Sequence, residues 1–201
     1  MGVQCSHNSG SIRNRMGDAV PDAHVALARL ARSTLALRLS IPYLVVGGIA
    51  ASYYMPGRIT SDIDILIHEA DAAQAMHDLT AAGANLHGAL TIAGTSWTLD
   101  DGIGLDLLTS RAPWIARAFA APRSWQGIPL IDLPYLAMLK MVSGRRRDEA
   151  DVVGMLAYAS DDALARVRHV VSAEMPGRVE DLEAYLFIGR AERRTKEADM
   201  Q

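Results

Sequence analysis

Two aspartates, Asp62 and Asp64, stand one residue apart in the otherwise apolar segment DIDILIH. In a β-strand, residues two apart point to the same face, so both carboxylates would lie side by side. Like charges at this separation repel, and they stay ionised at low cost only when a cation lies between them. Carboxylate oxygens suit a hard cation such as Mg²⁺. The alternative is a strand whose aspartates lie in solvent while its inward residues are Ile63, Ile65 and Ile67.

A third carboxylate, that of Asp106, interrupts the apolar segment GIGLDLLT. A charged side chain is seldom buried without a partner, so its place in an apolar strand indicates a function. If this strand lies beside the strand of Asp62 and Asp64, the three carboxylates converge and can hold two Mg²⁺ ions. The alternative is that Asp106 sits at an exposed strand end.

Two glycines, Gly47 and Gly48, follow the short apolar segment YLVV. At a strand-to-helix turn, bare backbone amides and the positive end of the helix dipole can meet phosphate oxygens. Lys140 lies in an apolar helix, so its ammonium must find an anion unless it reaches solvent. Asp148 follows three arginines at a predicted helix start, where local ion pairs explain it as well as a functional role does.

The elements that must position these residues predict a mixed α/β (α+β) fold, a small mixed β-sheet flanked by helices. Strands are predicted for YLVV and for residues 62–68, 86–92, 96–99, 104–109 and 128–131. Helices are predicted for residues 21–41, 49–54, 69–83 and 113–121, and the pattern beyond residue 134 is helical throughout. We therefore expect a disordered leader over residues 1–20, a core over residues 21–132 and a helical C-terminal region packed on that core over residues 133–201.

The composition restricts the partners. Half of the 201 residues are apolar, and 20 basic against 23 acidic residues give a formal net charge of -3. No overall field therefore attracts nucleic acid or an anionic membrane, and RNA contact would rest on two local basic clusters, at residues 145–147 and 190–196. The single cysteine, Cys5, excludes an intrachain disulfide, and no apolar run approaches the ~18 residues of a membrane span. We expect a cytoplasmic protein without a membrane partner.

In this order, a Gly-Gly turn, a short helix, an Asp-x-Asp strand and a later single Asp resemble the pattern of the DNA polymerase β-like nucleotidyltransferase superfamily. The segment GGIAASYYMPGRITSDIDILI looks most like the AbiEii-type members, which are toxins of type IV toxin-antitoxin systems. The segment LPYLAMLKMVSGRRRDEADVVGML is similar to the second signature of that family, a helix with a lysine followed by a basic turn and an acidic helix start. The superfamily implies a nucleotidyltransferase core with a helical C-terminal third.

The resemblance also implies a metal site and a catalytic set. Mg²⁺ or Mn²⁺ would be bound by Asp62, Asp64 and Asp106, and Asp106 would also help to deprotonate the acceptor. Lys140 would contact the phosphates of the nucleoside triphosphate (NTP). Asp148 would occupy the downstream acidic position of the family.

The same resemblance implies that Gly47 and Gly48 cradle the phosphates. Many members have a serine where this chain has Gly48, so a phosphate contact must come from elsewhere in this chain. The candidates lie on the loop that enters the acidic strand, and they are Arg58, Thr60 and Ser61. The guanidinium of Arg58 suits bidentate phosphate contact.

The activity that the resemblance implies is the transfer of a nucleoside monophosphate from an NTP to a hydroxyl acceptor. The acceptor would be a tRNA 3′ end or a protein, and the chain would be the toxin partner of a cognate antitoxin. One alternative is a small-molecule nucleotidyltransferase with an aminoglycoside-like acceptor. Another is a non-catalytic module of the same fold that binds nucleotide or a partner protein. The two alternatives differ from the toxin in acceptor or in turnover.

Overall fold

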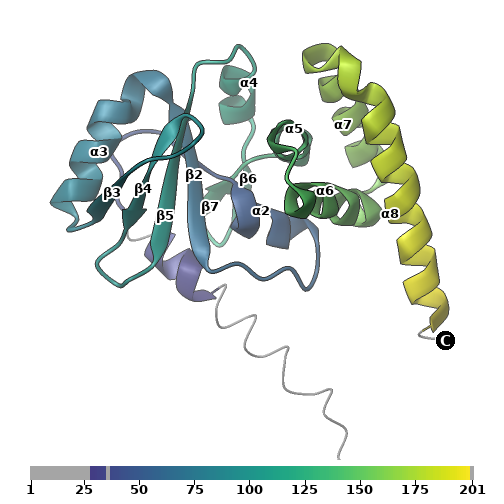
Figure 1. Cartoon of the computed structure of the whole chain (residues 1–201), viewed down its shortest axis with the longest axis horizontal. Helices are drawn as coiled ribbons and strands as arrows, with labels where there is room; N and C mark the ends of the chain where they lie inside the picture. The colour runs from purple at the N-terminus through teal and green to yellow at the C-terminus, as the bar shows by residue number, and fades with distance from the viewer. Residues whose placement is uncertain (1–27, 35–36, 200–201) are drawn as a thin grey trace, which may run out of the picture.

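The computed structural model describes residues 28–34 and 37–199. Within these residues the strands form one seven-stranded sheet in the order β3-β4-β5-β2-β1-β7-β6, with helices packed around it and a helical C-terminal region (Figure 1). The predicted mixed α/β fold class is confirmed. The leader predicted for residues 1–20 lies outside the described residues.

The centre of the sheet carries the acidic strands. Strand β2 (Asp62–His68) runs parallel to β5 (Gly104–Ser110) along its whole length. On its other side β2 pairs antiparallel with β1 (Leu44–Val45). The predicted bounds of β2 are confirmed. Three isoleucines alternate with the other residues, which is the signature of a strand with one buried face.

The edges of the sheet are short strands. Beside β5 lie β4 (Gly94–Thr98) and then β3 (Asn85–Ala89), both paired antiparallel. Beside β1 lies the parallel strand β7 (Ile128–Leu130), followed by the antiparallel β6 (Arg123–Trp125). The strand predicted to continue to residue 92 ends at Ala89. Strand β6 was not predicted, because three residues with two polar members give no alternation to recognise.

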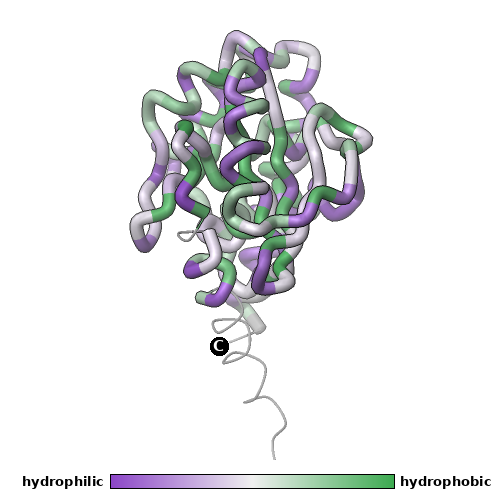
Figure 2. The backbone as a smooth tube through the Cα atoms, turned by 90° about the vertical axis from the view of Figure 1, so that its left-hand side faces the viewer, coloured by the Kyte–Doolittle hydropathy of each residue, from purple (hydrophilic) through white to green (hydrophobic). Residues whose placement is uncertain are grey.

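Three helical segments connect the strands. Helix α2 (Gly47–Tyr54) follows β1 directly, η1 (Glu69–Asp71) and α3 (Ala72–Ala81) follow β2, and α4 (Ile115–Ala120) follows β5. Figure 2 views the molecule from the α3 side, where hydrophilic and hydrophobic residues are interspersed along the outer elements. In the part of the chain that the structure describes, no helix combines the length and apolarity of a membrane span.

Residues 21–27 and 35–36 of the predicted N-terminal helix lie outside the described residues, and only part of the rest is helical. Residues 28–34 are helical, whereas residues 37–43 are not, so the prediction that the helix continues to residue 41 is wrong. Arg38 has a positive φ of 44°, which the helix cannot accommodate, and the proline at position 42 disfavours helical backbone at Ile41. The buried side chain of Leu37 instead joins the core on one face of the sheet.

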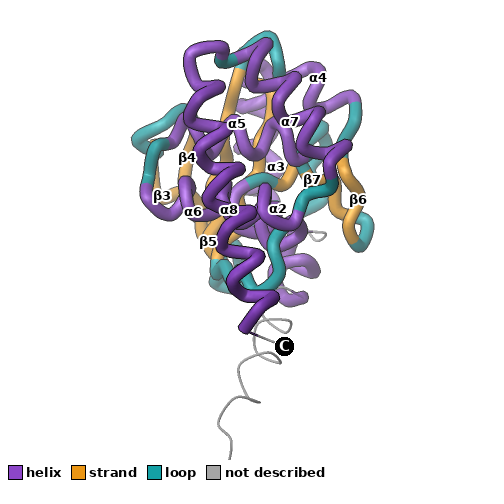
Figure 3. Tube along the Cα trace, turned by 90° about the vertical axis from the view of Figure 1, so that its right-hand side faces the viewer, coloured by secondary structure: helices purple, strands orange, loops and turns teal. Residues whose placement is uncertain are grey.

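Four helices form the C-terminal region (Figure 3). They are α5 (Leu133–Ser143), α6 (Arg146–Tyr158), α7 (Asp161–Glu174) and α8 (Val179–Asp199), with the short η2 (Pro176–Arg178) before α8. Asp132 accepts a hydrogen bond from Leu133 N–H at the start of α5, and Ser160 caps α7 in the same way. The predicted division of the chain at residue 132 stays a prediction.

The two faces of the sheet pack against different partners. Ile63, Ile65 and Ile67 lie in one buried cluster with Leu79 of α3. Leu66 lies in a second buried cluster, which contains residues of α2 and of all four C-terminal helices. Because side chains alternate along a strand, Asp62 and Asp64 share the face of Leu66. The strand therefore directs its carboxylates toward α2 and the C-terminal helices.

Candidate active site

The three predicted carboxylates lie on two adjacent strands. Asp64 of β2 and Asp106 of β5 are register partners. Asp62 is the register partner of Gly104, which has no side chain. Partners on neighbouring parallel strands point to the same face, and the strands are about 4.8 Å apart. The fold thus brings all three carboxylates to one face, at the ends of β2 and β5 where these strands begin.

The carboxyl of Asp64 is electrostatically perturbed. Its pKa is raised from the ordinary 3.8 to about 6, first because the carboxyl is buried and next because the charge of Asp62 lies nearby. The charge of Asp106 raises it further, while a hydrogen bond from Gly48 N–H to Oδ2 (3.2 Å) and the charge of Lys140 lower it. A desolvated carboxyl beside other carboxylates, like that of Asp64, is typical of sites that bind a cation or a proton.

Both glycines of the turn are explained by close approach to this strand. Gly47 has a φ of +57°, and a Cβ at this position would overlap the carboxylate of Asp64. A Cβ at Gly48 would overlap the side chain of Thr60. The N–H of Gly48 donates to the carboxylate of Asp64. The predicted cradle for phosphates stays a prediction.

The loop that enters β2 orients the first carboxylate. Thr60 is 92 % buried, and its Oγ1 donates a hydrogen bond of 2.6 Å to Oδ1 of Asp62. Ser61 is exposed and lines a cavity together with Thr60. Because Thr60 fills the space above Gly48, it stands where a side chain on residue 48 would begin. Thr60 is thus the hydroxyl nearest to that position among the three candidates from the sequence.

Lys140 finds its anions within the protein. Its Nζ lies 2.8 Å from Oδ1 of Asp148 and 2.7 Å from Oδ2 of Asp151, and all three side chains are buried. Arg58 joins the same group, with Nε 2.7 Å from Oδ1 of Asp151, and Arg145 pairs with Asp148 at 2.7 Å. The reading in which Lys140 reaches solvent is therefore wrong. Contact of Lys140 or Arg58 with phosphate stays a prediction.

Burial and pairing act against each other in this group. Burial raises the pKa of Asp148 and of Asp151, but hydrogen bonds to Lys140 and to further partners outweigh it, so both pKa values lie below the ordinary range. For Asp151 the further partner is Arg58. Asp148 and Asp151 are three residues apart and share a face of α6. That spacing was the one sequence signal that could have identified Asp151 as a partner of Lys140.

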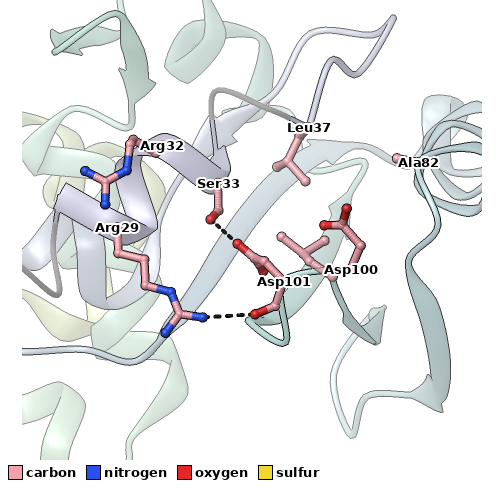
Figure 4. Close-up of a pocket in the computed structure, with 8 residues that line it drawn as sticks. Arg29, Arg32, Ser33, Leu37, Ala82, Asp100 and Asp101 are labelled. Atoms are coloured by element: carbon pink, nitrogen blue, oxygen red, sulfur yellow. Dashed lines mark hydrogen bonds between the residues drawn. The ribbon is translucent and has the colours of Figure 1, made fainter.

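Two cavities lie beside the helix of residues 28–34. The first has a volume of about 470 Å³ and reaches from Thr60 and Ser61 to Arg29 and Arg147. The second, of about 340 Å³, lies between the helix of residues 28–34 and the turn from β4 to β5 (Figure 4). There Arg29 donates to the carbonyl oxygen of Asp101, and no predicted site residue lines this cavity. Of these two cavities, the first is the one lined by predicted site residues, Thr60 and Ser61 on the loop that enters β2.

The fit of these residues to a metal ion depends on their spacing and on their donor chemistry. Among residues 28–34 and 37–199, no three His, Cys, Asp or Glu side chains are gathered closely enough to form a ready-made metal site. Asp62 and Asp64 are held instead by Thr60 and Gly48. The donor chemistry fits Mg²⁺ or Mn²⁺, because carboxylates suit hard cations and because a cation would relieve the repulsion that raises the pKa of Asp64.

No family model and no curated protein matches this chain, whereas several solved structures are similar to it. An antigenic nucleotidyltransferase-like protein from Paracoccidioides brasiliensis is 17% identical over 81% of this chain and 94% of its own, with a TM-score of 0.45. The antibiotic-resistance factor ANT(2'')-Ia is 16% identical over 89% and 100%, with a TM-score of 0.47. JHP933 from Helicobacter pylori is 12% identical over 89% and 96%, with a TM-score of 0.43. The likeness is distant and says nothing of this chain's activity.

Proposed function

We propose that this protein is a metal-dependent nucleotidyltransferase, which moves a nucleoside monophosphate from an NTP to a hydroxyl acceptor and releases pyrophosphate. The observation that carries this function is the pairing of Asp64 with Asp106 on parallel strands, two residues from Asp62 and against the start of α2. Three carboxylates on one partly buried face serve no packing purpose, since burial first and the nearby charges of Asp62 and Asp106 next raise the pKa of Asp64, so that its ionisation opposes folding.

Each residue has a role in this reaction. Mg²⁺ or Mn²⁺, held by Asp62, Asp64 and Asp106, would supply charge neutralisation at the phosphates and a lower pKa of the acceptor hydroxyl. Asp106 accepts the proton of that hydroxyl, whose oxygen bonds to the α-phosphorus as the bond to pyrophosphate breaks. Gly48 and Thr60 hold the carboxylates of Asp64 and Asp62 in place by hydrogen bonds, so catalysis depends mainly on positioning and charge.

Lys140 supports the site through its charge. It lowers the pKa of Asp64, while its own ammonium is held by Asp148 and Asp151. Arg58 is tied to the same carboxylate pair through Asp151. We assign Asp148 a positioning role, because it acts on the site through Lys140.

The acceptor and the biological role rest on the resemblance of the segments at residues 47–67 and 133–156 to AbiEii-type toxins. A tRNA 3′ end or a protein hydroxyl is the acceptor in that case, and the chain has a cognate antitoxin in the cytoplasm. An aminoglycoside-like acceptor would be cationic and would require an acidic pocket beside the carboxylates. A non-catalytic module would bind nucleotide without releasing pyrophosphate, which makes it an outcome of the test below.

The test is pyrophosphate release from each of the four NTPs with Mg²⁺ or Mn²⁺, with and without bulk tRNA. Replacing Asp62 or Asp106 with asparagine should lower the rate by about 100-fold or more, since each removes charge that acts in the transition state. Asp100→Asn is the matched control, because Asp100 is exposed in the turn after β4. Near wild-type rates in Asp62→Asn would refute the function. Nucleotide binding with no release under any acceptor would establish the non-catalytic module instead.

A further inference from the structure

The cavity of about 470 Å³ beside the acidic strand has a basic rim and apolar walls. Arg29 comes from the helix of residues 28–34 and Arg147 from the start of α6, so two distant segments bring guanidinium groups to one opening. Thr60 and Ser61 line the side toward β2. The apolar wall is made by Leu30, Ile59 and Ile103. The volume is within the range of about 300–1,000 Å³ that small-molecule sites occupy.

Arg147 brings a guanidinium charge to the cavity. Its described hydrogen bond goes to the backbone carbonyl oxygen of Ile59, at 3.4 Å. Among the described residues it forms no salt bridge, whereas Arg58 and Arg145 are each paired with an aspartate at 2.7 Å. Arg29 also donates to a carbonyl oxygen, that of Asp101, although the Asp101 carboxylate lies near enough for Arg29 to lower its pKa. Arg147 therefore keeps a positive charge at the cavity.

The Gly-Gly turn offers less room for an anion than this cavity does. The amide of Gly48 is engaged by Asp64, and Thr60 covers the turn. On the other side of Thr60 the cavity opens toward Arg147. Thr60 is hydrogen-bonded to Asp62, so an anion in the cavity would lie one side chain away from the carboxylates. Guanidinium groups can bind phosphate with two parallel hydrogen bonds, and two of them line this cavity.

We propose that this cavity is a phosphate-binding subsite, with Arg147 as its principal ligand and Arg29 as a second. The inference rests on the proposed function for the identity of the phosphate. Two sources share this chemistry, namely the triphosphate of the NTP and the backbone phosphates of an RNA acceptor. A cationic, aminoglycoside-like acceptor is disfavoured at this opening, because like charges repel.

The test is equilibrium binding of three probes: inorganic triphosphate, a non-hydrolysable NTP analogue and a short single-stranded RNA. Arg147→Ala should weaken binding about tenfold or more, the usual effect of losing a charge-assisted hydrogen bond. Arg147→Lys should recover part of the affinity because it keeps the charge but not the fork. Arg146→Ala is the matched control, since Arg146 is the exposed neighbour on α6 and does not line the cavity; its affinity should stay within about twofold.

The probes separate the two sources. A loss confined to triphosphate and the NTP analogue identifies the nucleotide, and a loss confined to RNA identifies the acceptor backbone. Equal affinity of wild type and Arg147→Ala for all probes overturns the subsite, as does an equal loss in Arg146→Ala or the absence of any binding to wild type.

The two proposals fail in different ways. Turnover by wild type together with unchanged binding in Arg147→Ala refutes the subsite and leaves the transferase standing. Triphosphate binding that depends on Arg147, without pyrophosphate release from any NTP, supports the subsite and refutes the transferase. Thermal unfolding of each variant is the control for folding. Because Arg147 is exposed, Arg147→Ala should unfold at the same temperature as wild type.

Discussion

Replacing Asp64 with asparagine should stabilise the protein while it abolishes nucleotidyl transfer. The folded protein raises the pKa of Asp64 from 3.8 to about 6, so ionisation of this carboxyl opposes folding. Each pH unit in that interval is worth about 1.4 kcal/mol, which gives a penalty of about 3 kcal/mol once Asp64 is ionised. Asparagine is uncharged and still accepts a hydrogen bond from Gly48 N–H. The variant should therefore be about 2 to 3 kcal/mol more stable at pH 7.5.

The sign of the pH dependence follows from the raised pKa. A carboxyl whose folded pKa exceeds its unfolded value costs nothing below about pH 4, and its penalty grows until the pH passes about 6. The gain of Asp64→Asn should thus be present at pH 7.5 and vanish near pH 4. Urea unfolding at both pH values measures the free energy of unfolding directly. Addition of Mg²⁺ at pH 7.5 should reduce the difference in stability between Asp64→Asn and wild type, because a bound cation stabilises the ionised carboxylates of the wild type.

Two results would refute this reasoning. One is an asparagine variant that is no more stable than wild type at pH 7.5, and the other is a gain of equal size at pH 4. Asp100→Asn serves as the control, because an exposed turn carboxylate should change the stability by no more than about 0.5 kcal/mol. A more stable protein that also kept its transfer activity would show that Asp64 is not part of the reaction.

The remaining predictions concern the ion pairs and the glycine turn. Lys140→Met should lower the free energy of unfolding, measured in urea, by about 3 to 5 kcal/mol, since it removes the ammonium that contacts the buried carboxylates of Asp148 and Asp151. A loss below about 1 kcal/mol would contradict the buried pairing. Gly47→Ala and Gly57→Ala both place a side chain at positive φ, but only Gly47 would meet a carboxylate. Gly47→Ala should therefore be the more destabilising and should lose transfer activity, and equal effects of both would show that backbone conformation alone matters.

Much of the local structure could be predicted from residue patterns. The alternating isoleucines fixed the bounds of β2 (Asp62–His68), and the turn residues from 100 to 102 separated β4 from β5. The helix predicted up to residue 41 does not extend over residues 37–41, where Arg38 has a positive φ and the side chain of Leu37 lies in the core. Strand β6 has no local pattern of a strand, and its strand geometry goes with its pairing to β7. The periodicity of apolar residues indicates the local preference of the backbone. A prediction from it fails where a contact with a distant segment determines the backbone conformation.

The candidate site divides in the same way. The strand period alone puts Asp62 and Asp64 on one face, and the apolar surroundings of Lys140 leave its ammonium either an anion or solvent. Which anion it is could not be read from the pattern, because the pairing with Asp151 also involves Arg58 from a loop 93 residues away. The phosphate cradle at the two glycines stays a prediction, and their close approach to Asp64 and Thr60 could not be read from the pattern.

The sequence by itself determined which residues carry charge in apolar surroundings and which of them share a strand face. It did so because side-chain direction in a strand and the cost of burying charge are local properties. Only the tertiary structure decided that β5 is the neighbour of β2, which places Asp106 beside Asp64, and that Arg29 and Arg147 meet at one cavity. Strand order and the meeting of distant segments depend on how the whole core packs, and no local pattern encodes them.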